Sequence, residues 1–195
     1  AVDQRAVEVE QHQPVRAGYT QAEEAKLRRI ASNQPNAITQ RQGCVTVGLA
    51  CGAGLDASEL RNTWVRQVLD HGDDGIEVVV TGTNARRVWV RREYEALVRA
   101  GIAGLSADRT IFGHTQASRN VVNSVLSRLQ FVEDGLTFDA ARMRTTWLAW
   151  LVTRPLSLRA ILDVSGLQSA RTLGEIISHL PPDTTDVRPA LRGED

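Results

Sequence analysis

The sequence predicts an α+β domain that is mainly α-helical and contains a small β-hairpin or sheet. Three observations support this fold class. Helix-start patterns precede amphipathic segments early in the chain, two short runs rich in β-branched residues follow, and the second half returns to helical periodicity. Helices that flank a hairpin, without an internal repeat, are typical of an α+β domain.

The predicted domain spans residues 19–181. Residues 1–18 are polar and lack sustained periodicity, so we expect a linker or arm there. Pro181 and Pro182 end the last predicted helix, and we expect residues 182–195 to form a disordered tail.

Capping boxes mark the starts of two helices. Thr20 and Glu23 form one such pattern, and Asp56 and Glu59 form a second, which begins a short helix. The other helices follow from apolar residues that recur at helical spacing. These expected helices lie at about 20–32, 39–53, 92–100, 117–130, 138–153, 157–164 and 169–179.

The β-hairpin is predicted from two runs rich in β-branched residues, 76–81 and 86–90. Residues 82–85, with the sequence Gly-Thr-Asn-Ala, join them, and this length and composition suit a hairpin turn. We therefore expect two antiparallel strands near the middle of the chain.

Composition excludes a membrane protein and a secreted one. With 195 residues, of which 42% are hydrophobic, the chain is long enough to bury a core in one domain. No apolar run approaches the roughly 20 residues of a membrane span, and the N-terminus lacks signal-peptide character. We expect a soluble, cytoplasmic protein without a membrane partner.

The charge balance argues against strong non-specific binding to polyanions. The formal net charge is zero, with 23 basic and 23 acidic residues. Lys26 is the one lysine, so any contact with nucleic acid must come from arginine, whose guanidinium suits bidentate phosphate binding. A GC-rich genome would produce the same arginine excess, and both explanations stay open.

Neither cysteines nor histidines indicate a metal site. Cys44 and Cys51 lie on one predicted helix, roughly 10 Å apart, which is too far for a disulfide. We expect both thiols to be reduced and buried. The histidines are scattered along the chain without metal-ligand spacing, so we expect no metal and no cofactor.

Four segments resemble the catalytic domain of tyrosine recombinases, the phage integrase family. Residues 141–152 are similar to the helix that opens with a His-x-x-Arg box, and 165–172 to the Leu-Gly-His-Ser box. Residues 54–60 are similar to the family's Gly-Leu-Arg-x-x-Glu-Leu box, and 81–90 to its hairpin. The resemblance covers residues 19–180 and implies the same fold.

The resemblance also implies a reaction, phosphoryl transfer, in which a tyrosine attacks DNA phosphate with help from two arginines, histidine and lysine. Of these side chains, only the second arginine is kept, as Arg144. Asp56 stands at the position of the first arginine and Asn84 at that of the lysine. Ala141 and Leu167 replace the two histidines, and Ile176 replaces the tyrosine. Losing this many groups predicts a catalytically inactive, degenerate member.

Some of the candidate site residues also have a structural interpretation. Asp56 would repel a phosphate, but it is well placed to cap a helix with Glu59. Arg144 is either an inherited phosphate clamp or a partly buried side chain that ties helices together. Ser178 and His179 are a weak nucleophile and base pair, because adjacent helical positions point apart.

The leading hypothesis is an inactive, integrase-like protein that binds double-stranded DNA and is related to DNA integration or recombination of a mobile element or phage. Backbone contacts to DNA need positioned cations rather than chemistry. If they share one face, the expected DNA contacts are Arg86, Arg87, Arg142, Arg144 and Arg171, with Arg91 and Arg92 beside the hairpin.

Two alternatives stay open. The first is a protein-interaction module on the same fold without DNA binding, which dispersed arginines would favour. The second is an active site-specific recombinase with an unrecognised nucleophile. By analogy, residues 174–180 are expected to dock on another copy or a partner protein. We also expect the N-terminal DNA-clamping domain that such recombinases carry to be missing, either trimmed away or never present.

Overall fold

The computed structural model describes residues 15–129, 136–182, 184, 188 and 192. Most of the expected arm, most of the expected tail and the end of the helix expected at 117–130 lie outside the described residues. Within them, no helix is both long enough and apolar enough to cross a lipid bilayer.

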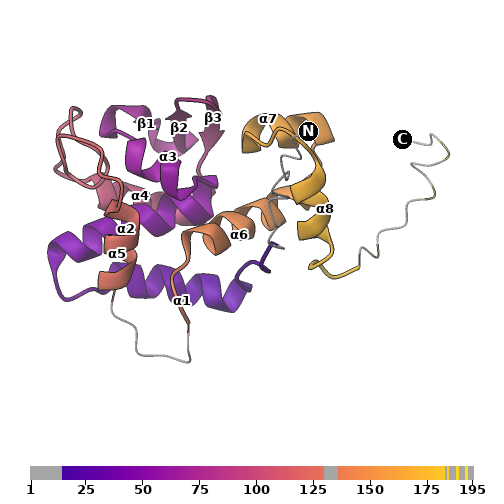
Figure 1. Cartoon of the computed structure of the whole chain (residues 1–195), viewed down its shortest axis with the longest axis horizontal. Coiled ribbons are helices and arrows are strands. Elements are labelled where there is room, and N and C mark those ends of the chain that lie inside the picture. The colour runs from indigo at the N-terminus through magenta and orange to yellow at the C-terminus, as the bar shows by residue number, and fades with distance from the viewer. Residues whose placement is uncertain (1–14, 130–135, 183, 185–187, 189–191, 193–195) are drawn as a thin grey trace, which may run out of the picture.

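Helices make up most of the domain and a small sheet lies at one edge of it, so the predicted mainly helical α+β class is confirmed (Figure 1). The first half contains α1 (Gln21–Ser32), α2 (Ala37–Ala53), α3 (Ala57–Asn62), β1 (Val68–Asp70), β2 (Ile76–Val80), β3 (Arg86–Trp89) and α4 (Arg92–Ile102). The second half contains α5 (Val121–Arg128), α6 (Ala140–Val152), α7 (Leu158–Ser165) and α8 (Arg171–Ile177).

Helix α2 is the centre of the domain. Each of its residues from 42 to 53 is buried, which suits a helix that is apolar on all sides. Helices α1, α4, α5 and α6 pack around it. Both Cys44 and Cys51 lie on this helix as buried, free thiols, so no disulfide joins them, as the spacing predicted.

The sheet contains one strand more than the predicted hairpin. Strands β1, β2 and β3 are antiparallel in that order, and Val78 of β2 lies between Val68 and Val88 in the register. The extra strand, β1, spans only three residues, too few for period-two alternation to be recognised in the sequence. Helices α3 and α7 lie near the sheet (Figure 1).

Both predicted capping boxes are present. The Thr20 hydroxyl accepts the Glu23 N–H at 3.2 Å, and the Glu23 carboxylate accepts the Thr20 N–H at 2.7 Å. Asp56 and Glu59 repeat this reciprocal arrangement at the start of α3. Each box satisfies N–H groups that would otherwise lack a partner at a helix start.

The clearest difference from the sequence prediction is the start of one helix. Helix α5 begins at Val121 rather than at 117, because residues 115–120 are exposed and belong to the loop after α4. Tyr19, the first residue of the predicted domain, is 5% exposed, and its hydroxyl donates to the Thr137 carbonyl at 2.5 Å. Burial raises the pKa of Tyr19 to about 12, so the phenol remains a donor at neutral pH.

Gly54 ends α2 at a point where no other residue fits well. Its φ of +67° lies in the left-handed region, which β-carbons disfavour. A β-carbon there would also come within 2.1 Å of the Trp147 ring, which is 1% exposed. The glycine thus lets α6 pack directly on the turn between α2 and α3.

We expect Gly54→Ala to lower the free energy of unfolding by about 2 kcal/mol or more, since it adds backbone strain and overpacks the Trp147 ring. Urea denaturation followed by circular dichroism measures this loss. The matched control is Gly174→Ala, because a β-carbon at Gly174 meets nothing within 4 Å and alanine favours the helix. Equal effects of the two substitutions would contradict the packing role of Gly54.

Candidate nucleic-acid interface

A cavity of about 760 Å³ opens where the starts of α3 and α6 meet the turn between α7 and α8. We call it the central cavity. Four of the six positions predicted from the recombinase pattern line it, namely Asp56, Ala141, Arg144 and Leu167. The structure therefore brings together residues that are up to 111 positions apart in the sequence.

The other two predicted positions lie elsewhere. Asn84, in the turn between β2 and β3, accepts a long hydrogen bond of 3.4 Å from Gln168, which follows Leu167. The turn therefore contacts the edge of the site without lining the cavity. Ile176 is 1% exposed and belongs to the core where α8 packs on α6.

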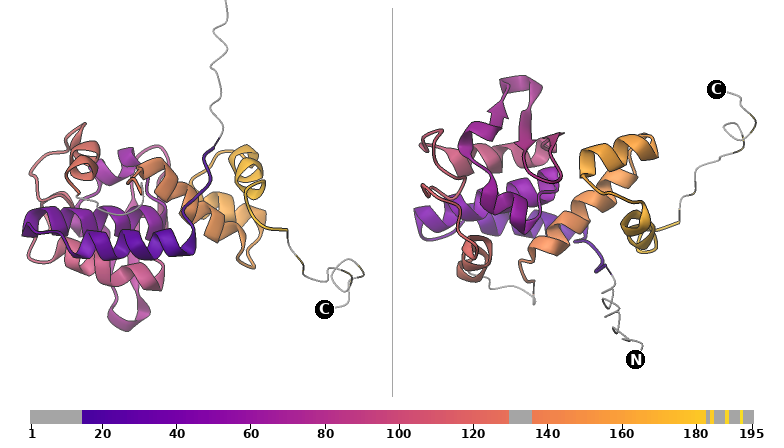
Figure 2. Two further views of the ribbon diagram at one scale, coloured as in Figure 1. Left: turned by 90° about the horizontal axis from the view of Figure 1, so that it is seen from below. Right: turned by 45° about the horizontal axis from the view of Figure 1, so that its top comes forward.

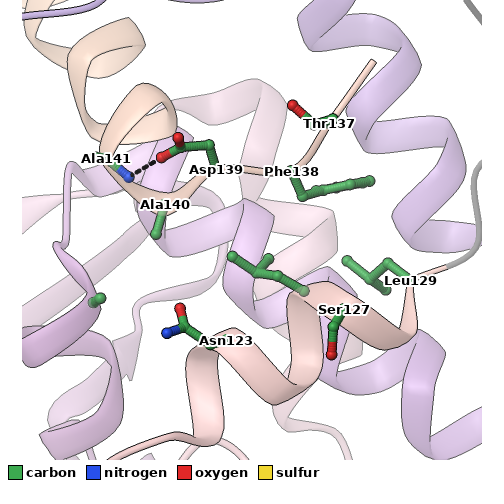
Figure 3. Close-up of a pocket in the computed structure, with 10 residues that line it drawn as sticks. Asn123, Ser127, Leu129, Thr137, Phe138, Asp139, Ala140 and Ala141 are labelled. Carbon is green, nitrogen blue, oxygen red and sulfur yellow. Dashed lines mark hydrogen bonds between the residues drawn. The ribbon is translucent and has the colours of Figure 1, made fainter. Parts of the chain in front are cut away.

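A groove of about 710 Å³ continues from the central cavity, because Ala57, Asp139 and Ala141 line both. Figure 3 shows that α5 borders it through Asn123 and Ser127, opposite the segment that leads into α6. Asp139 caps α6 by accepting the Ala141 N–H at 2.8 Å. The two hollows form one continuous depression along α3, α5 and α6.

Asp56 is occupied as a helix cap. Its carboxylate accepts the Glu59 N–H at 2.8 Å, and its own N–H donates to the Glu59 carboxylate at 3.0 Å. The structural interpretation of Asp56 is therefore confirmed. Asp56 also lines the central cavity, at the position where the family pattern would place an arginine.

Glu59 accepts hydrogen bonds from two arginines. Arg86 binds it in a bidentate manner, at 2.5 and 3.0 Å, and Arg144 binds it at 3.2 Å. The three side chains are only 9%, 4% and 13% exposed for Glu59, Arg86 and Arg144. We call this set the Glu59 network. The sequence indicated the capping role of Glu59 but gave no sign of its two arginine partners.

The two arginines also bind carbonyl groups at the end of α7. Arg144 donates to Ser165 at 2.9 Å and to the Gly54 carbonyl, and Arg86 donates to Val164 at 2.9 Å. The network therefore joins the start of α3, strand β3, helix α6 and helix α7. This arrangement agrees with the interpretation of Arg144 as a residue that ties helices together.

Burial and charge pairing act in opposite directions on these groups. Burial alone would raise the pKa of Glu59, but hydrogen bonds from Arg86 and the attraction of its charge outweigh burial, so the pKa is lowered. Burial lowers the pKa of Arg144, and Glu59 opposes that shift. Both groups remain charged at neutral pH, because their ordinary pKa values lie far from it.

Two further predicted DNA contacts are held inside the protein. Arg142 is 25% exposed, binds Glu23 at 3.1 Å and stacks 4.0 Å from the centre of the Tyr19 ring. Arg91 is 9% exposed and binds Glu24 at 2.9 Å. With Arg86 and Arg144, these arginines are structural cations rather than a solvent-facing set.

The exposed arginines carry weaker pairs. Arg87 is 65% exposed beside Glu77, and Arg171 is 69% exposed with Glu175 at 3.5 Å. The sequence analysis missed Arg16, which lines the central cavity, is 81% exposed and lies 3.5 Å from Asp139. It fell in the expected arm, where no local pattern marked it. The predicted arginines thus do not share one exposed face.

No tyrosine is accessible for nucleophilic attack. The chain has two, Tyr19 and Tyr94, and Tyr94 is fully buried with its hydroxyl on Glu24. Ser178 donates to a backbone carbonyl and the His179 ring contacts the Val15 carbonyl, so they do not pair with each other. Among the described residues, no group of three or more metal-binding side chains occurs.

No protein-family model and no curated protein matches the sequence. Solved structures do match the fold. The chain is similar to XerA recombinase with a TM-score of 0.61 and 14% identity, over 94% of this chain and 64% of that one. It is also similar to XerH site-specific recombinase bound to a palindromic difH substrate, with a TM-score of 0.61 and 12% identity. This match covers 84% of this chain and 50% of that one.

A third match is the Tn1549 transposon integrase in complex with a circular intermediate DNA, with a TM-score of 0.54 and 13% identity, over 94% of this chain and 67% of that one. These matches confirm the fold that the sequence resemblance implied, a tyrosine recombinase catalytic-domain-like fold. The chain spans half to two thirds of the length of the proteins it matches.

We expect Glu59→Gln to lower the free energy of unfolding at pH 7 by about 3 kcal/mol, because it leaves two buried arginines with a neutral partner. Chemical denaturation measures the difference. Asp163→Asn is the matched control, since Asp163 pairs with Arg159 at 3.0 Å on the exposed surface of α7, where such pairs contribute little. A loss no larger than the control's would contradict the central role of Glu59.

The same substitution should change the pH dependence of stability. Because the pKa of Glu59 is lowered in the folded protein, its contribution is fully present above the unfolded pKa of about 4.3 and disappears as the pH falls through the folded value. The stability difference between the wild type and Glu59→Gln should therefore shrink below pH of about 4.3. A difference that stays constant down to the acid transition would rule out this assignment.

Proposed function

We propose that this chain is a DNA-binding, integrase-like domain of the tyrosine recombinase fold that does not cut DNA. The proposal rests on the identity of the residues that line the central cavity. The positions that match the family's reactive residues hold Asp56, Ala141 and Leu167, and the one retained arginine, Arg144, is committed to Glu59 and to carbonyl groups.

Several features support the absence of catalysis. Phosphoryl transfer by this family's mechanism needs a nucleophile beside cations that stabilise the developing charge. Both tyrosines are buried, and an acidic residue, Asp56, lines the cavity at the position of the family's first arginine. Removing members of a catalytic set costs several orders of magnitude in rate, and here most of the set is replaced.

Two features support DNA as the partner. The XerH and Tn1549 integrase structures that share this fold contain DNA. Arg16 lines the central cavity, and Arg171 precedes the lining residue Thr172. Both are exposed and held by ion pairs of 3.5 Å, which contribute only about 0–1 kcal/mol and are easily exchanged for phosphate. These two residues, rather than Arg86 and Arg144, are the proposed phosphate contacts, with Arg87 on the hairpin as a third.

A protein-interaction module is the second candidate, and one observation favours it. Four of the arginines expected to contact DNA are satisfied inside the protein, and the formal net charge is zero. A protein with this charge distribution needs few counterions and has little general attraction for DNA.

We expect the wild-type protein to bind a random-sequence DNA duplex in fluorescence anisotropy, with affinity that falls as salt rises. The double variant Arg16→Gln/Arg171→Gln should bind more weakly and reduce the salt slope by about 2, one for each lost phosphate contact. Arg159→Gln is the matched control, being 85% exposed on α7, while neither Arg159 nor its sequence neighbours line the cavity. No binding at low salt by the folded wild type would favour the protein-interaction module instead.

The absence of cutting is tested separately. We expect no covalent protein–DNA adduct when the protein is incubated with nicked duplexes and separated on a denaturing gel. An active tyrosine recombinase run in parallel supplies the positive control for trapping. An adduct that survives denaturation and maps to a residue of this chain would establish an active recombinase with an unrecognised nucleophile.

A further inference from the structure

A second polar cavity lies far from the central cavity in the fold. The loop that joins α4 to α5 lies at the end of the molecule opposite α7 and α8, in every view (Figure 1, Figure 2). A cavity of about 540 Å³ opens in this loop, and none of its lining residues lines the central cavity. Its polar lining residues are Arg109, His114, Thr115, Gln116 and Ser118.

The loop is held in place by a buried residue, Thr110, which is 1% exposed. The Thr110 N–H donates to the His114 carbonyl at 2.9 Å, and its hydroxyl accepts the His114 N–H at 3.1 Å. Gly113 turns the chain between them with φ of +88°. The Arg109 carbonyl accepts the Val65 N–H at 2.9 Å, which anchors the other side of the cavity.

The charge and the hydrogen-bonding groups of this cavity suit an anion. Within the described residues, the Arg109 side chain has no carboxylate partner, unlike the arginines of the Glu59 network. No acidic residue lines the cavity. Asp108, the nearest acid in the sequence, is not a lining residue. It accepts the Ser106 hydroxyl at 2.5 Å, and this hydrogen bond, with the nearby charge of Arg109, lowers the pKa of Asp108. One guanidinium and several neutral donors therefore line the cavity, and none of the lining residues carries a negative charge.

We propose that this cavity binds a phosphate group. The Arg109 guanidinium supplies a charge-assisted, bidentate contact, and the hydroxyls of Thr115 and Ser118, the Gln116 amide and the His114 ring supply further donors. The phosphate belongs either to a nucleic-acid backbone or to a free phosphate compound, and the chemistry of recognition is the same. The site does not depend on DNA binding at the central cavity.

The test is a titration of the wild-type protein with inorganic phosphate, followed by amide shifts in ¹H–¹⁵N NMR spectra at constant ionic strength. We expect saturable shifts confined to residues 109–118. Arg109→Gln should weaken the apparent affinity about tenfold, the loss expected for one charge-assisted contact. Arg119→Gln is the matched control, because Arg119 is exposed in the same loop and does not line the cavity. Shifts that are absent, or that persist unchanged in Arg109→Gln, overturn the proposal.

A second arm identifies the source of the phosphate. Weaker binding of a DNA duplex by Arg109→Gln than by Arg119→Gln would assign the site to a nucleic-acid backbone. Unchanged duplex binding, together with lost phosphate binding, would assign it to a free phosphate compound. Because the inorganic phosphate titration contains no DNA, failure of the proposed DNA function leaves this test intact. Thermal unfolding of each variant confirms that it is folded.

Discussion

The buried carboxylate of Glu59 is the group on which the arrangement of this domain depends. An isolated buried charge costs several kcal/mol, so Glu59 is tolerable only while Arg86 and Arg144 stay in place. These arginines come from β3 and α6, and both reach on to carbonyl groups of α7. One desolvated anion thereby fixes the sheet, the capped start of α3 and two later helices relative to each other.

The ion pairs and hydrogen bonds of this network occupy donors of Arg144 that a bound phosphate would otherwise need. A site that stabilises a transition state needs donors that are preorganised but still free to bind the reacting group. In the central cavity, the donors of Arg144 are taken up by Glu59 and by backbone carbonyls. Arg16, which lines the cavity, has instead an exposed pair at 3.5 Å with Asp139, and such pairs contribute little to stability.

The sequence was sufficient for features that are local. Each capping box involves residues three positions apart, and the hairpin is marked by its turn, so both were predicted correctly. The resemblance placed Asp56 and Arg144 at one site. The partners of Glu59 could not be predicted, since they lie 27 and 85 positions away and single ion pairs leave no periodic pattern. For the same reason, Arg16 was missed in a segment that looked irregular.

The balance of charge around Glu59 also constrains which residue can occupy position 56. Two cations, Arg86 and Arg144, face two anions, Glu59 and Asp56, and Asp56 acts on Arg144 through its charge. An arginine at position 56, as in the family pattern, would leave three cations around a single carboxylate and would remove a helix cap. An arginine at position 56 is therefore unfavourable while both Arg86 and Arg144 remain bound to Glu59.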